Sequence, residues 1–149
     1  MAIDGVLIIP LKKHADSRGW LVELFRTDTL PEGFEVAMSY FSMTHPGVAR
    51  GPHEHHDQTD GFIFFDGTYE LHLWENRPGA ADNYEVHRIG EDNPVFVTVP
   101  PGVVHGYKNV SERDAFVINV PNRLYAGKNR SEEVDEIRHE ADENSKFKI

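Results

Sequence analysis

Four residues have the types and spacing that could bring acid–base or metal chemistry to one point. His53 and His55 lie two apart, so on a strand their side chains would face the same side. Asp60 follows five residues after His55, and His105 ends the run Pro-Pro-Gly-Val-Val-His at residues 100–105. Three imidazoles and a carboxylate can hold Fe, Mn, Ni or Zn. Without a metal, the same imidazoles can act as general acid and base, since histidine titrates near neutral pH.

The elements that must position these residues are short strands separated by turns. Apolar or alternating segments are interrupted at regular intervals by Gly, Pro, Asp and Asn. The pattern predicts strands at residues 5–9, 20–26, 35–43, 62–65, 69–74, 84–89, 95–99, 103–107 and 116–120. Only residues 131–139 have helical spacing, so we expect at most one short C-terminal helix. Many short strands indicate an all-β sandwich or closed barrel.

Composition narrows the classes of protein to consider. The chain has 149 residues, no cysteine and a formal net charge of −10. This length suits one domain over residues 1–149, and the missing cysteines exclude disulfides and thiolate metal sites. Nucleic-acid binding depends on clustered Lys and Arg, so the acidic charge disfavours it. No apolar run approaches the roughly 18 residues of a membrane span, and no signal peptide precedes the first strand. We therefore expect a cytoplasmic protein that binds neither nucleic acid nor membrane.

Two segments resemble the motifs of the cupin fold. The first set is Gly47, His53, His55, Asp60 and Gly67, in which Asp60 replaces the usual Glu. The second, residues 100–109, has every fixed position of Pro-x-Gly-x-x-His-x-x-x-Asn, although Pro94 stands where that motif usually begins with Gly. Both motifs in this order indicate an all-β cupin, a double-stranded β-helix or jelly-roll barrel.

Three further segments extend the resemblance. Residues 16–23 look like Asp-x-Arg-Gly-aromatic-x-x-Glu, residues 50–53 like Arg-Gly-x-His, and residues 99–107 like Ile-Pro-x-Gly-x-x-His-Gly-aromatic. With them, residues 5–125 resemble the dTDP-4-dehydrorhamnose 3,5-epimerase family, of which the chain looks like a divergent member. That family is homodimeric, cytoplasmic and metal-independent, and it serves deoxysugar and surface-polysaccharide synthesis. The resemblance implies a homodimer that acts on a sugar nucleotide without a cofactor.

The same resemblance implies roles for individual residues. His53 would be the base that removes a proton from a carbon next to the sugar ketone. The proton would be delivered by His55, His105 or Tyr125. The residues that would grip the diphosphate and the sugar are Arg18, Glu23, Arg50 and Arg123, since guanidinium forks suit phosphate oxygens.

Two positions depart from the epimerase pattern. Counting back from Gly67 places Asp60 where the family has the lysine that stabilises the enolate. Counting from Ser111 places Ile118 where the family has its acid tyrosine. The sequence also ends without the aromatic-rich final segment of longer epimerases, so we expect no carboxylate partner for His53 from the tail.

Three functions remain open from the sequence. One is a nucleotide-deoxysugar epimerase or ketoisomerase, since Arg-Gly-x-His-x-His at residues 50–55 also resembles dTDP-4-keto-6-deoxyglucose ketoisomerases. In those enzymes two histidines on one face move protons between adjacent carbons. The second is a metal-dependent cupin enzyme acting on another small molecule, with Fe, Mn, Ni or Zn held by His53, His55, Asp60 and His105. The third is a non-catalytic carbohydrate-binding cupin, suggested by the missing lysine and tyrosine.

Overall fold

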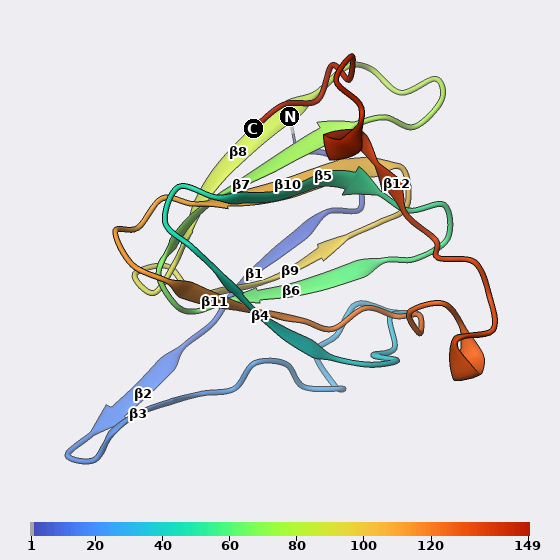
Figure 1. Cartoon of the computed structure of the whole chain (residues 1–149). Coiled ribbons are helices and arrows are strands. Elements are labelled where there is room, and N and C mark those ends of the chain that lie inside the picture. The colour runs from blue at the N-terminus through green and yellow to red at the C-terminus, as the bar shows by residue number, and fades with distance from the viewer. Residues whose placement is uncertain (1) are drawn as a thin grey trace.

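Two facing five-stranded antiparallel sheets form the body of the molecule (Figure 1). The computed structural model describes residues 2–149. The first sheet has the order β1-β9-β6-β11-β4, with β1 (Leu7–Pro10), β4 (Tyr40–Thr44), β6 (Asp60–Phe64), β9 (Val95–Val99) and β11 (Ala115–Asn119). The second has the order β12-β5-β10-β7-β8, with β5 (Ala49–Glu54), β7 (Thr68–Glu75), β8 (Tyr84–Gly90), β10 (Val103–Asn109) and β12 (Ile137–Arg138).

A hairpin of β2 (Lys13–Asp16) and β3 (Gly19–Val22) projects from this body as an arm (Figure 1). Two short 3-10 turns, η1 (Lys128–Arg130) and η2 (His139–Ala141), lie in the C-terminal part of the chain. No helix within residues 2–149 has the length and apolarity that crossing a bilayer requires.

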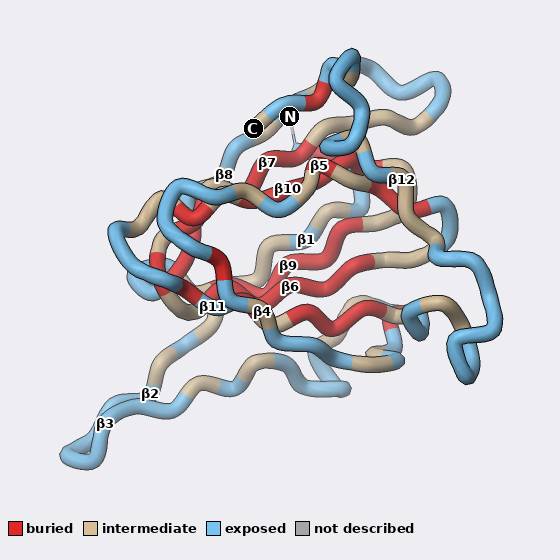
Figure 2. Tube along the Cα trace, in the orientation of Figure 1, coloured by how far each residue is buried: buried red, intermediate tan, exposed pale blue. Residues whose placement is uncertain are grey.

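The apolar core lies between the two sheets, where Figure 2 shows the facing strands as buried. Phe62 and Phe64 of β6 point into this core, together with Val97 of β9. Their neighbours in the strands, Ile63 and Phe96, point to the outer face and belong to a second apolar cluster. Residues 24–36 contribute the side chains that cover this outer face. Because β6 and β9 are buried on both faces, residues 62–64 and 95–97 are consecutive apolar residues rather than an alternating pattern.

The predicted fold class is confirmed, but the predicted C-terminal helix is wrong. Residues 131–136 form no regular element, and β12 pairs with β5 through Ile137–Glu54 and Arg138–His53. No α-helix forms anywhere in residues 2–149. The helical spacing of Val134, Ile137 and Arg138 is overridden by these long-range contacts, as weak local propensities commonly are.

The strand pairs that position the candidate site meet at one end of the two sheets. His53 of β5 lies directly opposite His105 of β10, next to a register shift between His105 and Tyr107. Asp60 begins β6 in the facing sheet, and the short β12 lies on the other side of β5. The loop between β11 and β12 passes over the same end.

Candidate active site

The four residues predicted to do chemistry come together in one cluster. The Asp60 carboxylate reaches from the first sheet to His53 and His105 of the second sheet and to His55, which follows β5. Its Oδ2 atom lies 2.9 Å from Nε2 of His55, 3.0 Å from Nε2 of His105 and 3.7 Å from Nε2 of His53. All four donor atoms lie within 4.8 Å of one another. The other carboxylate oxygen accepts a hydrogen bond of 2.6 Å from Gln58 Nε2.

Charge is fixed inside this cluster by burial and hydrogen bonding. Burial alone would raise the pKa of Asp60, but hydrogen bonds from His105 and His55, together with the nearby His53 ring, hold it well below its usual range. Burial alone would lower the pKa of His55, but Asp60 and the carbonyl of Asp135 raise it to about 9. At neutral pH His55 is therefore an imidazolium that donates from both ring nitrogens, to Asp60 and to the Asp135 carbonyl.

The pKa of His105 shifts in the opposite direction from that of His55. Its ring nitrogens face the Val103 carbonyl at 2.9 Å and Asp60 Oδ2 at 3.0 Å. Complete burial, reinforced by the nearby His53, lowers the pKa of His105 despite these two acceptors. A neutral His105 donates to only one of them. This ring is therefore an uncharged, buried support beneath Asp60 and beside His53.

His53 is the most open member of the cluster. Its side chain is 17% exposed, against 7% for His55 and 1% for His105. Its Nε2 lies 3.7 Å from Asp60 Oδ2 and its Nδ1 lies 3.9 Å from Glu136 Oε1, so neither contact is a formed hydrogen bond. Glu136 precedes β12, so a residue before the final segment places a carboxylate near His53, a source that the sequence analysis did not consider. His53 thus lies between two carboxylates with both ring nitrogens available.

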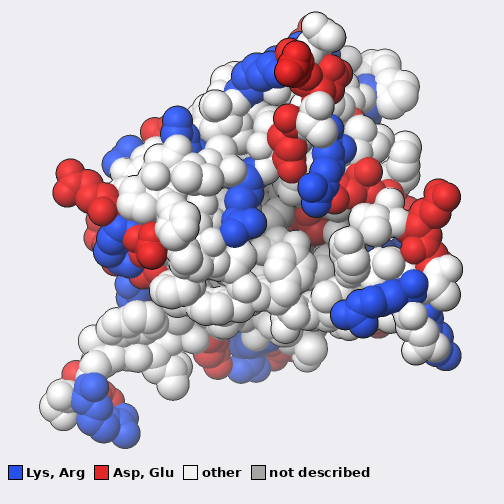
Figure 3. All heavy atoms as spheres, viewed as in Figure 1, with Lys and Arg blue, Asp and Glu red and all other residues white. Residues whose placement is uncertain are grey.

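Two cavities share His53 as a lining residue. The larger has a volume of 720 Å³ and also contains Met38, His55 and Tyr125 in its wall. The smaller has a volume of 410 Å³ and is lined by Ser42, Arg50, Gly51, Phe62, Tyr107 and Asn119, among others. Tyr40, Glu136 and Arg138 line both cavities. Figure 3 shows this face hollowed near its centre, with charged side chains of both signs around the hollow.

Three of the residues predicted to contact the substrate line these cavities. Arg50 lines the smaller one and donates to Thr44 Oγ1 at 2.9 Å and to the Met43 carbonyl at 2.8 Å. Arg123 lines the larger one, 2.9 Å from Asp57 Oδ2. Tyr125, in the loop after β11, also lines the larger cavity and is 56% exposed.

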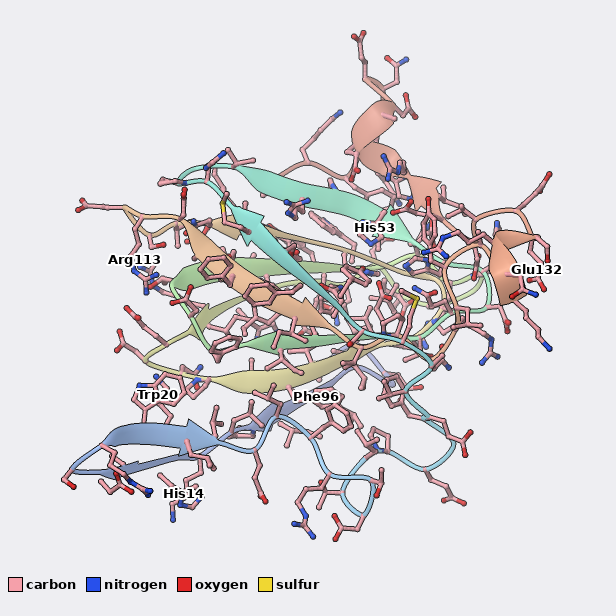
Figure 4. The ribbon with its side chains drawn as sticks, turned by 60° about the horizontal axis from the view of Figure 1, so that its bottom comes forward. His14, Trp20, His53, Phe96, Arg113 and Glu132 are labelled. Carbon is pink, nitrogen blue, oxygen red and sulfur yellow. The ribbon has the colours of Figure 1, made fainter. Side chains whose placement is uncertain are left out.

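Arg18 and Glu23 lie elsewhere in this chain. Arg18 is at the tip of the arm, where it pairs with Asp16, and its side chain is 88% exposed. Glu23 follows β3 and pairs with Arg26. Neither lines the cavities at His53, and Figure 4 shows the arm, marked by His14 and Trp20, lying apart from His53.

The conformation and close packing of residue 51 explain why the Arg-Gly-x-His segment needs a glycine there. Its φ of +81° favours glycine, and a Cβ atom there would lie 2.7 Å from the His105 carbonyl oxygen. The same Cβ atom would lie 3.2 Å from His53 Nδ1. A side chain at residue 51 would therefore push β5 from β10 and displace the two opposed histidines.

Sequence reasoning missed two groups at the site. Asn119 points into the smaller cavity from β11, whereas Ile118, the position obtained by counting, packs in the outer apolar cluster. Burial alternates along β11 in the structure, but its sequence Ala-Phe-Val-Ile-Asn does not alternate between apolar and polar residues, so the sequence carried no signal for this position. Asp135 accepts hydrogen bonds from the backbone N–H groups of residues 56, 57 and 58 at 2.8, 2.9 and 2.9 Å. No local pattern marks that contact, because its partners lie more than 70 residues apart.

The fold and the histidine cluster together define a protein of the cupin class. Among solved structures, the rmlC epimerase of Mycobacterium tuberculosis superposes with a TM-score of 0.77 at 18% identity, over 93% of this chain and 70% of that one. This likeness confirms the predicted cupin fold. It also confirms the predicted resemblance to the dTDP-4-dehydrorhamnose 3,5-epimerase type.

The chain belongs to the family described as polysaccharide biosynthesis C-terminal domain, whose model matches residues 14–132. It is 34% identical over 134 residues to the probable low-salt glycan biosynthesis epimerase Agl13 of Haloferax volcanii, covering 88% of this chain and 86% of that protein. It is 36% identical over 126 residues to the spore coat polysaccharide biosynthesis protein SpsL of Bacillus subtilis, covering 83% and 82%.

Proposed function

We propose that this chain is an epimerase that removes and returns a proton at a carbon next to the ketone of a nucleotide-activated sugar. The observation that carries the proposal is the position of His53, which opens into both cavities and lies between two carboxylates. A relative named as a glycan biosynthesis epimerase supports the same reaction class. A base that lines both cavities can reach a sugar bound in either of them, which proton abstraction requires.

Proton removal leaves negative charge on the ketone oxygen. Glu136 and Asp60 stabilise the imidazolium that forms on His53, since they lie 3.9 and 3.7 Å from its two nitrogens. Arg50, held by two hydrogen bonds in the wall of the smaller cavity, supplies positive charge for the developing enolate. Asp60, which occupies the family's lysine position, is bonded beneath the histidines, so its charge is compensated there.

The returning proton needs a donor. Tyr125 lines the larger cavity, and Tyr40 lines both. Tyr40 is 46% exposed, but partial burial of its phenol, reinforced by the charge of Asp60, raises its pKa, so the phenol stays protonated at neutral pH and can act as an acid. The imidazolium of His55, which lines the larger cavity together with His53, is a third donor, and it would serve a ketoisomerase reaction instead.

Exchange in heavy water tests the reaction. Wild-type protein is incubated in heavy water with dTDP- and UDP-linked 4-keto-6-deoxy sugars. Deuterium should appear on a carbon beside the ketone, and mass spectrometry and NMR measure its incorporation and position. Inversion at that carbon identifies an epimerase, and migration of the carbonyl identifies a ketoisomerase. His53→Asn should abolish the exchange, whereas His45→Asn, on a surface histidine paired with Asp114, should not change it. If no sugar in the panel takes up deuterium, the proposal is wrong.

Metal-dependent chemistry is a second candidate, supported by the cluster of His53, His55, Asp60 and His105. Tetrahedral ligands at 2.0–2.1 Å from an ion lie about 3.3 Å apart, and the carboxylate–imidazole separations of 2.9, 3.0 and 3.7 Å bracket that value. An Fe, Mn, Ni or Zn ion held there would supply Lewis-acid stabilisation of the enolate oxygen. Elemental analysis before and after chelation tests metal-dependent chemistry. This second candidate is established if the protein contains stoichiometric metal and if removing that metal lowers both the melting temperature and the exchange rate.

We also propose that the protein works as a homodimer. Trp20 and Leu21 of the arm are 53% and 62% exposed, so the arm carries apolar surface away from its own core. Arg18 lies at the tip of the same arm, away from its own site. In the proposed dimer the arm lies against the second copy of the chain, and Arg18 at its tip reaches the cavities of that copy.

A further inference from the structure

Arg138 holds the carboxylate that faces His53. Its Nε atom donates a hydrogen bond of 3.0 Å to Oε2 of Glu136, and the other oxygen of that carboxylate, Oε1, lies 3.9 Å from Nδ1 of His53. A hydrogen bond between carboxylate and imidazole needs a separation of about 2.7–3.2 Å, so Glu136 must move about 1 Å closer before it can accept from the ring. In the free protein Glu136 is therefore bonded to Arg138 and only close to His53.

The guanidinium of Arg138 is open to a ligand. Arg138 lines both cavities, whereas Arg50 lines only the smaller one and Arg123 only the larger one. β12 pairs with β5 in a register that places Arg138 opposite His53. The Arg138 side chain is 62% exposed, and within residues 2–149 its Nε atom is the only one of its nitrogens that makes a side-chain hydrogen bond. Its Nη donors are thus free to bind an anion that enters either cavity.

We propose that Arg138 binds the diphosphate of the sugar nucleotide and that this contact releases Glu136 to His53, so that the base is completed only when the whole substrate is bound. The inference rests on the proposed function and adds to it a binding residue and a step that controls the base. The diphosphate is attached to the same sugar ring that carries the acidic C–H group. A ring that lies at His53 therefore brings its phosphates towards the neighbouring Arg138.

Charge decides the direction of this exchange. The pair of Arg138 and Glu136 is exposed on the arginine side, and ion pairs of that kind contribute little to stability. Phosphate oxygens accept two parallel hydrogen bonds from a guanidinium, which makes phosphate the stronger partner. A bound diphosphate also places negative charge beside the Glu136 carboxylate, which repels it. On its other side, the His53 imidazole is the donor that Glu136 can reach.

The contact with Glu136 determines which nitrogen of His53 acts as the base. When Glu136 accepts from Nδ1, the ring proton stays on that nitrogen and Nε2 is left free to take the proton from the sugar carbon. The carboxylate then stabilises the imidazolium that forms. Glu136 is a positioning residue in this scheme, because it acts through His53 and does not touch the sugar.

A truncated substrate separates binding from activation. The probe is a 1,5-anhydro-6-deoxy-4-keto hexose, which lacks phosphate and the anomeric oxygen, and deuterium uptake is measured with and without UDP or dTDP. Either nucleotide should accelerate exchange by the wild type about tenfold or more. Arg138→Ala should exchange the truncated sugar faster than the wild type, because nothing holds Glu136 away from His53, and the nucleotides should add nothing. The same variant should raise the KM for the intact sugar nucleotide about tenfold or more.

Two further variants identify the route of the effect. Glu136→Gln in the Arg138→Ala background should remove the gain with the truncated sugar, because glutamine carries no negative charge. Arg113→Ala is the matched control, since Arg113 pairs with Asp66 at 2.8 Å and is 49% exposed but lines neither cavity, and its loss should change neither rate. If Arg138→Ala exchanges the truncated sugar at the wild-type rate or more slowly, Arg138 does not hold Glu136 back and the inference is wrong.

A crystal structure of the wild type with UDP or dTDP measures the contact directly, whether or not the truncated sugar reacts. Glu136 Oε1 should lie within about 3.2 Å of His53 Nδ1, and Arg138 should contact a phosphate. An Arg138 without phosphate, or a separation still near 3.9 Å, overturns the inference, while deuterium uptake by the intact sugar nucleotide keeps the proposed function. If the wild type shows no exchange with any substrate, the proposed function fails and the inference fails with it.

Discussion

Three histidines of one cluster have three different states, although the sequence presents them as equivalent. His55 is charged because two acceptors hold its ring nitrogens. His105 is neutral because burial outweighs its contact with Asp60. His53 is open to the cavities and makes no tight hydrogen bond. The motif therefore identifies the group, but exposure and partners decide which member is free to react.

Asp60 is the residue on which this cluster depends. Asp60→Asn keeps the side-chain shape and removes the charge that His55 and His105 meet at 2.9 and 3.0 Å. Because these groups are buried, we expect the free energy of unfolding to fall by about 1–3 kcal/mol, measured by urea denaturation. Exchange activity should also fall, since His53 loses one of its two carboxylate neighbours.

Asp114→Asn is the matched control for that measurement. Asp114 also accepts from a histidine, His45, at 2.8 Å, but the two side chains are 52% and 67% exposed. Surface pairs of this kind change stability by no more than about 1 kcal/mol. If Asp60→Asn is no more destabilising than Asp114→Asn, the buried carboxylate does not hold the cluster together.

At the scale of elements, most strands were predictable because their signal is local. The strand predicted at residues 95–99 coincides with β9, and those predicted at 69–74 and 84–89 match β7 and β8 within one residue at each end. The cupin motifs correctly placed His53 and His105 together, since both sit on strands that pair in register. His55 joins them although it lies beyond the end of β5.

The C-terminal contribution was not predictable, because distant partners determine it. Glu136 and β12 contact His53 and β5 across more than 80 residues of chain, and nothing near residue 136 indicates that pairing. Of the two strands of the arm, only β3 was predicted. The polar β2 (Lys-His-Ala-Asp) was not, because it lacks an apolar strand pattern. It forms as the partner of β3, through pairs such as Ala15–Trp20.

Asp135 fastens the C-terminal segment to the loop that carries His55. Asp135→Ala removes three hydrogen bonds to the backbone N–H groups of residues 56–58. We expect faster hydrogen exchange at these three amides in NMR, and a loss of stability of about 1 kcal/mol, because partly exposed N–H groups regain water.

Glu133→Ala is the control for this element, since Glu133 is exposed in the same segment. It should leave the amide exchange of residues 56–58 unchanged. Unchanged exchange in Asp135→Ala as well would mean that the loop is held by its other contacts, such as the Gln58–Asp60 hydrogen bond.

At the scale of the whole molecule, the predicted substrate-binding residues divide between two places. Arg50 and Arg123 line the cavities beside His53, whereas Arg18 lies at the tip of the projecting arm. The net charge of −10 makes local cations necessary for an anionic substrate. If Arg18 grips the diphosphate, as the family resemblance implies, it must do so in the site of a second copy of the chain.

Mixing inactive variants tests this arrangement. Arg18→Ala and His53→Asn should each be nearly inactive alone, and each should elute as a dimer in size-exclusion chromatography with light scattering. After an equal mixture is allowed to exchange subunits, a mixed dimer has one site with an intact His53 and an intact partner arm, so about a quarter of the wild-type activity should return. Arg50→Ala mixed with His53→Asn should recover nothing, because both residues line the cavity of one chain. If the protein is monomeric, the arm does not complete a neighbouring site. The same conclusion follows if the mixture of Arg18→Ala with His53→Asn is as inactive as the mixture of Arg50→Ala with His53→Asn.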